Sequence, residues 1–314
     1  NLNKMENPTG GDNIIYESSI IGGKYNNLVD GQKSSSILGG NSNFITGLYN
    51  TTSGETSITD NTILGGSGNT ITKTSRSGIL GGFNNTLNSS DGDTVLMDTT
   101  QNSNIVGGDN NSITGAQYNS TIVGGSGNTI TGYKSNPVQS IINGKENSIL
   151  GGAGNNISSV ERNGIIGGTS NIINGEGSVT NNVIAGGLNN YISGNTNIFI
   201  GGGTDNNVIP NAFPFTSPNS AIIAGSGNTI FADTQEGNIV ILGGNNITAT
   251  TENTVYVPNL NIDSTPTLNN TATQILVRNS STNEVEYRDV SSIGGGGNTV
   301  NDATQTFNWF MTIT

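Results

Sequence analysis

The chain has 314 residues, of which 31% are hydrophobic, 10% are charged and 47 are glycine, and its formal net charge is −12. It contains no cysteine and no histidine, which excludes disulfide frameworks, thiolate metal sites and every catalytic or metal site built on an imidazole. The negative charge opposes nucleic-acid binding, and no apolar run in the sequence reaches the roughly 18 residues that span a bilayer.

Two over-represented residue types indicate a repeat. Asparagine is about one residue in six, and glycine replaces much of the apolar side-chain bulk of an ordinary chain. Isoleucine is preferred to leucine, which favours strands over helices. The aliphatic content still exceeds that of disordered chains. We therefore expect an all-β repeat protein rather than two globular domains.

Residues 1–18 lead into the repeat, which we place at residues 19–250. Its unit is aliphatic-aliphatic-Gly-Gly-x-x-Asn-x-aliphatic, as in the run from Ile63 to Ile71. The first glycine falls at positions 22, 39, 65, 81, 107, 124, 151 and 167, so short gaps of 16 or 17 residues alternate with long gaps of 26 or 27. Less regular copies continue to residue 248, which gives about thirteen rungs. This pattern predicts an elongated parallel β-roll or β-helix, in which each rung buries its apolar side against its neighbours.

Each rung reads as a short strand, a tight turn at Gly-Gly and a second short strand. Gly and Asn adopt positive φ in turns with little strain. Because the Asn recurs four residues after the first Gly, stacked rungs should align these side chains in a ladder of amide hydrogen bonds. The aliphatic residue two positions later, such as Ile71 or Ile130, should form an internal stack. The predicted turn ladder consists of Asn26, Asn43, Asn69, Asn85, Asn111, Asn128, Asn155, Asn171, Asn190, Asn206 and Asn228.

Two aliphatic residues precede each Gly-Gly, for example Ile165 and Ile166. Neighbouring residues of a strand point to opposite faces, so both faces of this strand are apolar. One face can line the core, and the other needs cover. We expect the cover to come from identical chains in a homotrimer, intertwined or side by side, with the Gly pair allowing close approach. The alternative is that one residue of each pair lies exposed.

The long gaps hold polar insertions rich in Thr, Ser, Asn, Asp, Gly and Pro, which are typical of loops. They should leave the shaft in rows along one side, where loops on a rigid scaffold often carry binding. Their aromatic residues can stack on sugar rings or pack in a protein interface, or they can pack back on the shaft. The candidate receptor-contact residues are Tyr49, Tyr133, Phe213 and Phe215.

The repeat stops near residue 250, and we interpret residues 251–314 as a small β junction or cap. Residues 253–262 read as a strand, and residues 274–278 and 283–290 read as two strands around a turn. Gly294 to Gly297 predict a flexible joint. The aromatic run that contains Trp309 predicts a cap or a contact with a neighbouring subunit.

The layout from Ser36 through Ile37-Leu38-Gly39-Gly40 to Gly47 resembles the head repeat of trimeric autotransporter adhesins, a Ser-Val-Ala-Ile-Gly-x-x-Ser-x-Ala-x-Gly unit. The resemblance implies a parallel β-roll in a trimer. This chain departs from that unit in its doubled Gly, its Asn turn and its long insertions. Residues 254–268 and 275–290 resemble the junction of many phage and large-virus fibre proteins, which implies a place on a virion.

No pattern for catalysis, cofactor binding or metal binding emerges. The run from Gly65 to Ile71 resembles the calcium-binding β-roll but lacks its Asp and its nine-residue period. The acidic residues lie in predicted loops, away from any groove where paired carboxylates could cleave a glycan. We therefore expect no enzyme, no cofactor, and no catalytic or metal-ligating residue.

The sequence thus predicts a structural fibre on a virion surface that attaches to a host glycan or protein through many weak contacts. Its expected partners are its own copies, other virion structural proteins and the host surface, without nucleic acid or membrane insertion. Three alternatives stay open: a trimeric adhesin of a bacterial surface, a glycan-degrading tailspike, and an ice-binding solenoid. The last needs flat Thr-x-Thr rows, which we do not expect in these rungs.

Overall fold

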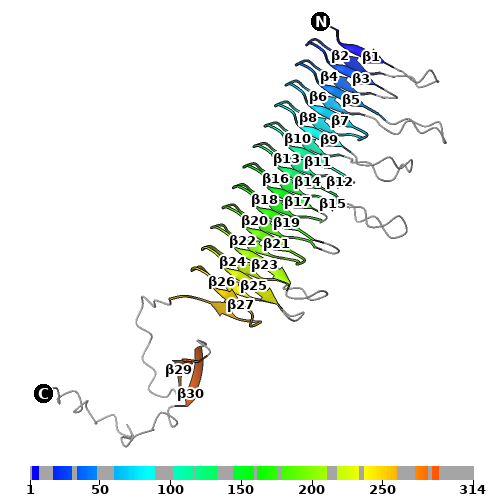
Figure 1. Ribbon diagram of the computed structural model, residues 1–314. Coiled ribbons are helices and arrows are strands. Elements are labelled where there is room, and N and C mark those ends of the chain that lie inside the picture. Colours follow the sequence, from blue (N-terminus) through cyan, green and yellow to red (C-terminus); the bar gives the residue numbers. More distant parts are fainter. Residues whose placement is uncertain are drawn as a thin grey trace, which may run out of the picture. The chain divides into compact units, whose positions relative to one another are not determined.

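The computed structural model describes residues 2–6, 17–29, 34–47, 60–88, 102–115, 117–132, 144–158, 161–175, 179–210, 218–232, 237–259, 273–281 and 285–289. Contacts divide the chain into two units, Asn1–Asn259 and Leu260–Thr314. The first unit is a stack of β-rungs, and the second contains a β-hairpin (Figure 1). The described residues contain no helix.

The first unit is built from two parallel sheets of thirteen strands each. Successive rungs supply neighbouring strands, so the sheets run the length of the stack (Figure 1). Sheet 1 consists of β1 (Lys4–Glu6), β3 (Asn27–Val29), β5 (Phe44–Thr46), β7 (Thr70–Thr72), β9 (Thr86–Asn88), β11 (Ser112–Thr114), β14 (Thr129–Thr131), β17 (Asn156–Ser158), β19 (Ile172–Asn174), β21 (Tyr191–Ser193), β23 (Asn207–Pro210), β25 (Thr229–Ala232) and β27 (Thr248–Ala249).

Sheet 2 carries the strands that enter each Gly-Gly turn. It consists of β2 (Ser19–Ile20), β4 (Ser36–Ile37), β6 (Thr62–Ile63), β8 (Gly78–Ile79), β10 (Asn104–Ile105), β13 (Thr121–Ile122), β16 (Ser148–Ile149), β18 (Gly164–Ile165), β20 (Val183–Ile184), β22 (Phe199–Ile200), β24 (Ala221–Ile222), β26 (Val240–Ile241) and β28 (Val255–Tyr256).

Two smaller pairings accompany the sheets. Single parallel bridges link the residue after each Gly-Gly, from Lys24 through to Asn245, and form a third row at the turn. The short strands β12 (Gln117–Tyr118) and β15 (Gly144–Lys145) also pair in parallel. Each rung is therefore tied to the next at several points around its cross-section.

The core consists of two columns of aliphatic side chains that the sheets bury completely. In sheet 1 the middle residue of each strand points inward, as Ile71 and Ile130 do, and in sheet 2 the second residue does, as Ile63 and Ile122 do. Each residue pairs in register with its counterpart one rung away, for example Ile71 with Leu87 and Ile63 with Ile79. The predicted all-β parallel solenoid and its internal aliphatic stack are confirmed.

The solenoid extends beyond the range given by the Gly-Gly pattern. Strand β1 lies in the predicted lead-in, residues 1–18, and Met5 pairs in register with Leu28. At the other end β28 pairs with β26 after residue 250. Neither strand is adjacent to a Gly-Gly turn of its own, so the repeat pattern does not mark them.

One rung contains three consecutive glycines, and its ladder residue is the predicted Asn206. The run Gly201-Gly202-Gly203 holds its turn at Gly202 and Gly203, because Asn206 takes the ladder position four residues after Gly202. Gly201 therefore occupies the place of the second aliphatic residue, and the ring of Phe199 lies beside it. Three consecutive glycines left the register open in the sequence.

The second unit contains an antiparallel hairpin of β29 (Gln274–Arg278) and β30 (Val285–Asp289). These strands fall where the sequence predicts two strands around a turn. The predicted joint at Gly294 to Gly297 and the aromatic run at Trp309 lie outside the described residues.

Candidate functional site

The eleven predicted ladder asparagines are all fully buried and form one continuous column beside the turn. Asn128 is typical. Its Nδ2 donates to Oδ1 of Asn111 (3.1 Å) and to the carbonyls of Gly124 (3.0 Å) and Gly152 (3.1 Å). Its Oδ1 accepts from the backbone N and from Nδ2 of Asn155, both at 3.1 Å. Each side chain thus links three rungs, which removes the cost of burying an amide.

Asn3 begins this column below Asn26. Its Nδ2 donates to the carbonyl of Gly22 (2.8 Å), and its Oδ1 accepts from the backbone N of Asn26 (3.1 Å). Its acceptor bond is the same as in the repeat, but its amide donates to the first rather than the second glycine of the next rung.

The positive φ of the turn lies on the residue before the ladder Asn, rather than on the Asn itself. Tyr25, Ser42, Asn84 and Asp205 all have φ between 52° and 56°. At most rungs this residue is Gly, Asn or Asp, which adopt the left-handed conformation readily, and only Tyr25, Ser42 and Ser170 adopt it there without that preference.

A second buried column was not predicted. It lies four residues before the first Gly, and its members are serine or asparagine in most rungs. The side-chain oxygen of each accepts from the backbone N of the next rung, as Ser103 does from Ser120 (3.3 Å) and Asn147 from Asn163 (3.1 Å). The recurrence of Ser or Asn at this position is visible in the sequence, but it is masked by the abundance of both residues.

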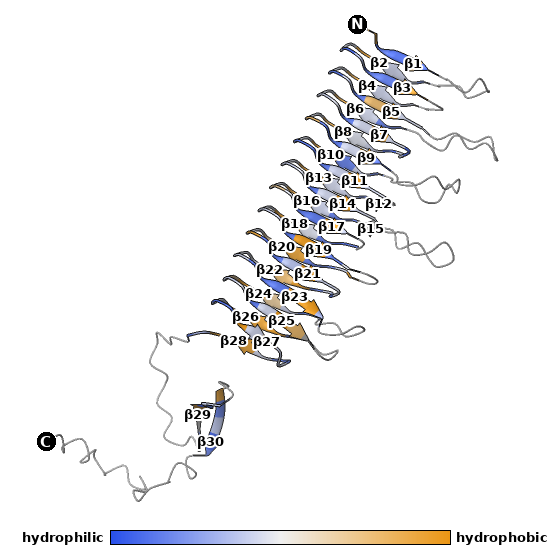
Figure 2. Ribbon diagram, viewed as in Figure 1, coloured by the Kyte–Doolittle hydropathy of each residue, from blue (hydrophilic) through white to orange (hydrophobic). Residues whose placement is uncertain are grey.

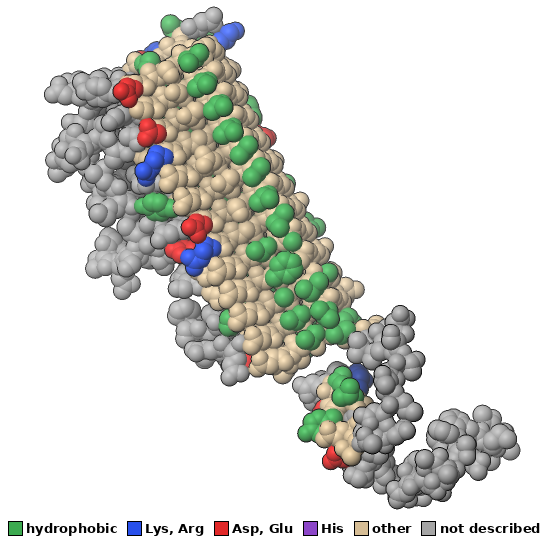
Figure 3. Space-filling model, turned by 180° about the vertical axis from the view of Figure 1, so that it is seen from behind, with side chains coloured by type: hydrophobic (Ala, Val, Ile, Leu, Met, Phe, Trp, Pro, Cys, Tyr) green, Lys and Arg blue, Asp and Glu red, His purple; other side chains and the backbone are tan. Residues whose placement is uncertain are grey.

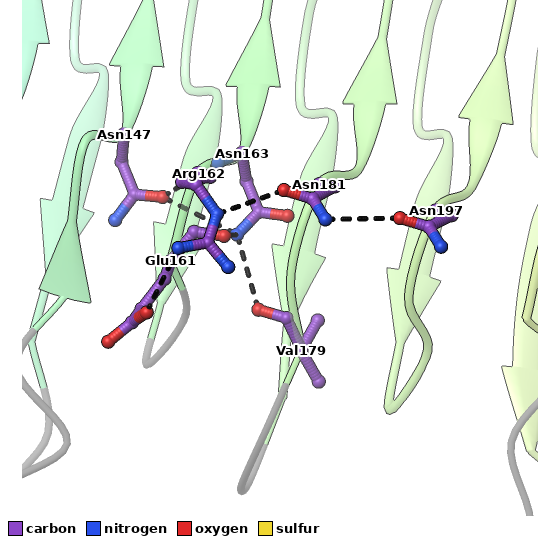
Figure 4. A network of polar contacts seen from close by, with 7 residues as sticks. All are labelled: Asn147, Glu161, Arg162, Asn163, Val179, Asn181 and Asn197. Atoms are coloured by element: carbon purple, nitrogen blue, oxygen red, sulfur yellow. Dashed lines mark hydrogen bonds and ion pairs between the residues drawn. The ribbon is translucent and has the colours of Figure 1, made fainter.

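Figure 4 shows this column next to a second, exposed ladder. Asn163 donates to the carbonyl of Val179 (3.4 Å), while on the surface Nε of Arg162 donates to Oδ1 of Asn181 (3.0 Å). Asn181 in turn donates to Asn197 (3.1 Å). Hydrogen bonds between rungs therefore reinforce this corner both inside and outside.

The two glycines of the pair have different roles. A Cβ on the second glycine, such as Gly125 (φ +86°), would lie 2.2 Å from the carbonyl oxygen of Gly152 in the next rung. A Cβ on the first glycine, Gly124, would meet no atom within 4 Å. The second glycine is therefore required by stacking within one chain, and only the first leaves open space at the surface.

The second aliphatic residue before each turn points outward, as the parity of the strand predicts. These side chains form one column along sheet 2, which we call the aliphatic ridge, and each is 39–62% exposed. Figure 3 shows hydrophobic side chains along this face of the shaft. The ridge consists of Ile21, Leu38, Leu64, Leu80, Val106, Val123, Leu150, Ile166, Ile223, Leu242 and Val257.

A flanking column lies beside the ridge, formed by the first residue of each sheet 2 strand. From β2 to β18 it holds only Ser, Thr, Gly or Asn. From β20 onward it holds Val183, Phe199, Ala221, Val240 and Val255. The flanking column therefore becomes more hydrophobic over the last five rungs, and Figure 2 shows more hydrophobic residues at this end of the shaft than at the other.

No position of the ridge or the flanking column carries a charge. The described charged side chains of the shaft lie elsewhere, many of them at the corner before sheet 2, such as Glu17, Asp60, Arg76, Glu146 and Arg162. What distinguishes this face is its row of exposed aliphatic side chains, and exposed apolar patches of this kind mark contact sites.

The outer face of sheet 1 carries hydroxyl rows that we did not expect. Thr70 and Thr72 flank the buried Ile71, and Thr129 and Thr131 flank Ile130. Oγ1 of Thr114 donates to Oγ1 of Thr131 at 3.4 Å. The rows are short, because Asn88 interrupts them at β9 and Ile172 and Tyr191 replace the hydroxyls further along.

All shaft insertions connect a sheet 1 strand to the following sheet 2 strand, and none interrupts a Gly-Gly turn. Segments 48–59, 89–101 and 133–143 follow β5, β9 and β14 in this way. The candidate contact residues Tyr49, Tyr133, Phe213 and Phe215 belong to such insertions and lie outside the described residues.

The part of the chain that the structure describes brings no three acidic side chains together as a metal site. It also has no helix with the length and apolarity of a membrane span. No protein-family model matches the chain, and no curated protein matches it.

Proposed function

We propose that this chain is the shaft of a homotrimeric surface fibre of a virion, and that its insertions attach to a host glycan or protein. The observation that carries the proposal is the placement of every insertion on one side of the rung. A solenoid that tolerates insertions only between sheet 1 and sheet 2 repeats them along one edge at multiples of the rung spacing, about 4.8 Å. Such an array suits attachment through many weak contacts.

The interior supports a mechanical role. Two buried polar columns and two aliphatic columns tie each rung to the next, and single bridges add a third row at the turn. A stiff shaft loses little conformational freedom on attachment, which favours avidity. The placement on a virion rests on the resemblance of residues 254–268 and 275–290 to fibre junctions.

The homotrimer is supported by the aliphatic ridge. Eleven large aliphatic side chains at 39–62% exposure form a longer apolar strip than monomeric proteins usually leave in water. Sedimentation of the purified chain tests this part of the proposal. We expect a species of three times the 32.2 kDa chain mass, and a stable monomer at micromolar concentration would contradict it.

Attachment is tested separately by binding of the labelled protein to cells of the native host. The double variant Phe213→Ser and Phe215→Ser should weaken binding, and Phe83→Ser, which removes an exposed aromatic ring from the shaft outside the insertions, serves as the matched control. Immunogold electron microscopy of the native source distinguishes a fibre on a particle from an adhesin on a cell. Labelling of cells alone would overturn the virion placement.

A further inference from the structure

We infer that the outer face of sheet 2 is the contact surface between copies of this chain, which lie parallel and in register, and that the contact is widest over the last five rungs. This inference rests on the homotrimer proposed above and adds the surface, the direction and the register of the assembly.

The regular spacing of the ridge side chains indicates which kind of partner can contact all of them. Its side chains repeat once per rung, about 4.8 Å apart, over all thirteen strands of sheet 2, with Ala185 and Gly201 as the two small members. A partner that contacts every member must present groups at the same spacing over the same length. A second copy of this chain meets that condition, whereas a globular protein covers only a few rungs.

The size of the strip also suits a stable contact. Thirteen rungs make it roughly 58 Å long and, with the flanking column, about 12 Å wide, which corresponds to roughly 700 Å² on each copy. Specific interfaces bury about 800 Å² per partner. A contact along the whole strip therefore reaches the usual size, and a contact over half of it does not.

The flanking column favours the parallel arrangement, because an antiparallel contact would place its apolar residues of β20 to β28 against the small or polar residues of β2 to β10. The absence of charge permits copies to lie in register. Around a rotation axis parallel to the shaft, each residue meets its own copies at the same height, so a charged side chain would face like charges. Neither the ridge nor the flanking column carries a charge along its whole length. An aliphatic ridge, by contrast, is complementary to itself.

The width of the apolar contact surface depends on whether the flanking column is polar or apolar. Over β2 to β18 the flanking residues are small or polar, so the apolar surface is one side chain wide. From β20 onward residues such as Val183, Phe199 and Val240 add a second apolar column beside the ridge. At β22 the ring of Phe199 lies beside Gly201 and supplies the apolar surface that the missing ridge side chain would give. The closest association of the copies is therefore assigned to the C-terminal rungs of the shaft.

The absence of native cysteine makes single-cysteine cross-linking a direct test. Leu64→Cys and Ile223→Cys each replace an exposed ridge residue, and Thr70→Cys on sheet 1 is the control from the same rung as Leu64. Under mild oxidation we expect cross-linked pairs of chains from both ridge variants and none from the control. Val240→Cys should also cross-link, and Thr62→Cys, its flanking-column counterpart near the N-terminus, should do so more slowly.

Direction is tested by mixing the two ridge variants with chains of different tag length. Leu64 and Ile223 lie four rungs on either side of Leu150, so an antiparallel contact would join residue 64 to residue 223. Parallel copies in register join only like residues. Mixed pairs alone would overturn the inference.

The remaining outcomes separate this inference from the proposed function. A trimer that sediments as expected but forms no ridge cross-link would overturn this surface and leave the trimer intact. A monomer without cross-links would overturn both. Equal cross-linking at Val240→Cys and Thr62→Cys would overturn the graded contact alone.

Discussion

The interior ladder and the exterior ridge reverse the usual distribution of side chains. Asn128 is fully buried, and Val123, five residues earlier, is 45% exposed. Both belong to columns that repeat once per rung. They differ in whether a neighbouring rung supplies contacts for the side chain. Every polar group of Asn128 has a partner in a neighbouring rung, whereas the described residues place nothing over Val123. In a stacked fold, the neighbouring rung decides which side chains can be buried.

The largest loss of stability is expected at the turn that aligns the ladder. Gly125→Ala places a Cβ against the carbonyl oxygen of Gly152 in the next rung, at 2.2 Å. Neither backbone can move without disturbing the ladder, so we expect the free energy of unfolding to fall by at least about 4 kcal/mol. Chemical denaturation followed by circular dichroism measures the loss.

The control is the adjacent glycine. Gly124→Ala meets no atom within 4 Å and should change stability by less than about 1 kcal/mol. Equal losses at positions 124 and 125 would show that stacking does not require the second glycine.

The ladder itself gives the next largest effect. Asn128→Ala removes the side-chain donor to the carbonyl of Gly124 and the acceptor of the backbone N of Asn155, while the carbonyl of Gly152 and Nδ2 of Asn155 each keep other bonds. Each unsatisfied buried group costs about 1–3 kcal/mol, so we expect a loss of about 3 kcal/mol or more in total. Hydrogen exchange should locate the weakening to the rungs of residues 111, 128 and 155. Exchange that stays unchanged there would show that the column adds no stability.

Much of this arrangement could be predicted from the sequence, because stacking repeats the same environment at the same position. The Ile-Ile parity before Gly-Gly predicted that Ile165 and Ile166 face opposite sides, and the structure places Ile165 in the core and Ile166 on the surface. The left-handed residue before the ladder Asn is Gly, Asn or Asp in most rungs, as turn preference predicts, whereas Tyr25, Ser42 and Ser170 at the same position could not be predicted from their types. Strand β1 was missed because Asn3 joins the ladder and Met5 pairs in register with the core residue Leu28 without a Gly-Gly turn of their own.

Two adjacent residues, one in the core and one on the ridge, allow their contributions to stability to be compared. Ile122 is fully buried and Val123 is 45% exposed. Ile122→Ala should cost about 3 kcal/mol, because it opens a cavity between the columns. Val123→Ala should cost less than about 0.5 kcal/mol at protein concentrations where the chain is monomeric. Denaturation at low protein concentration measures both, and equal costs would mean that the ridge already packs within one chain.

The substitution that we expect to change the stability of the fold least should change the assembly of the copies most. Leu150→Asp adds a carboxylate at a position that is 50% exposed, so the rung itself should lose less than about 0.5 kcal/mol. In parallel copies three such carboxylates meet at one height, where desolvation and like-charge repulsion both oppose contact. We expect sedimentation to show dissociated chains with an unchanged circular dichroism spectrum. Thr129→Asp, an outward position on sheet 1, should leave the assembly intact, and an intact assembly of the Leu150→Asp variant would remove the ridge from the interface.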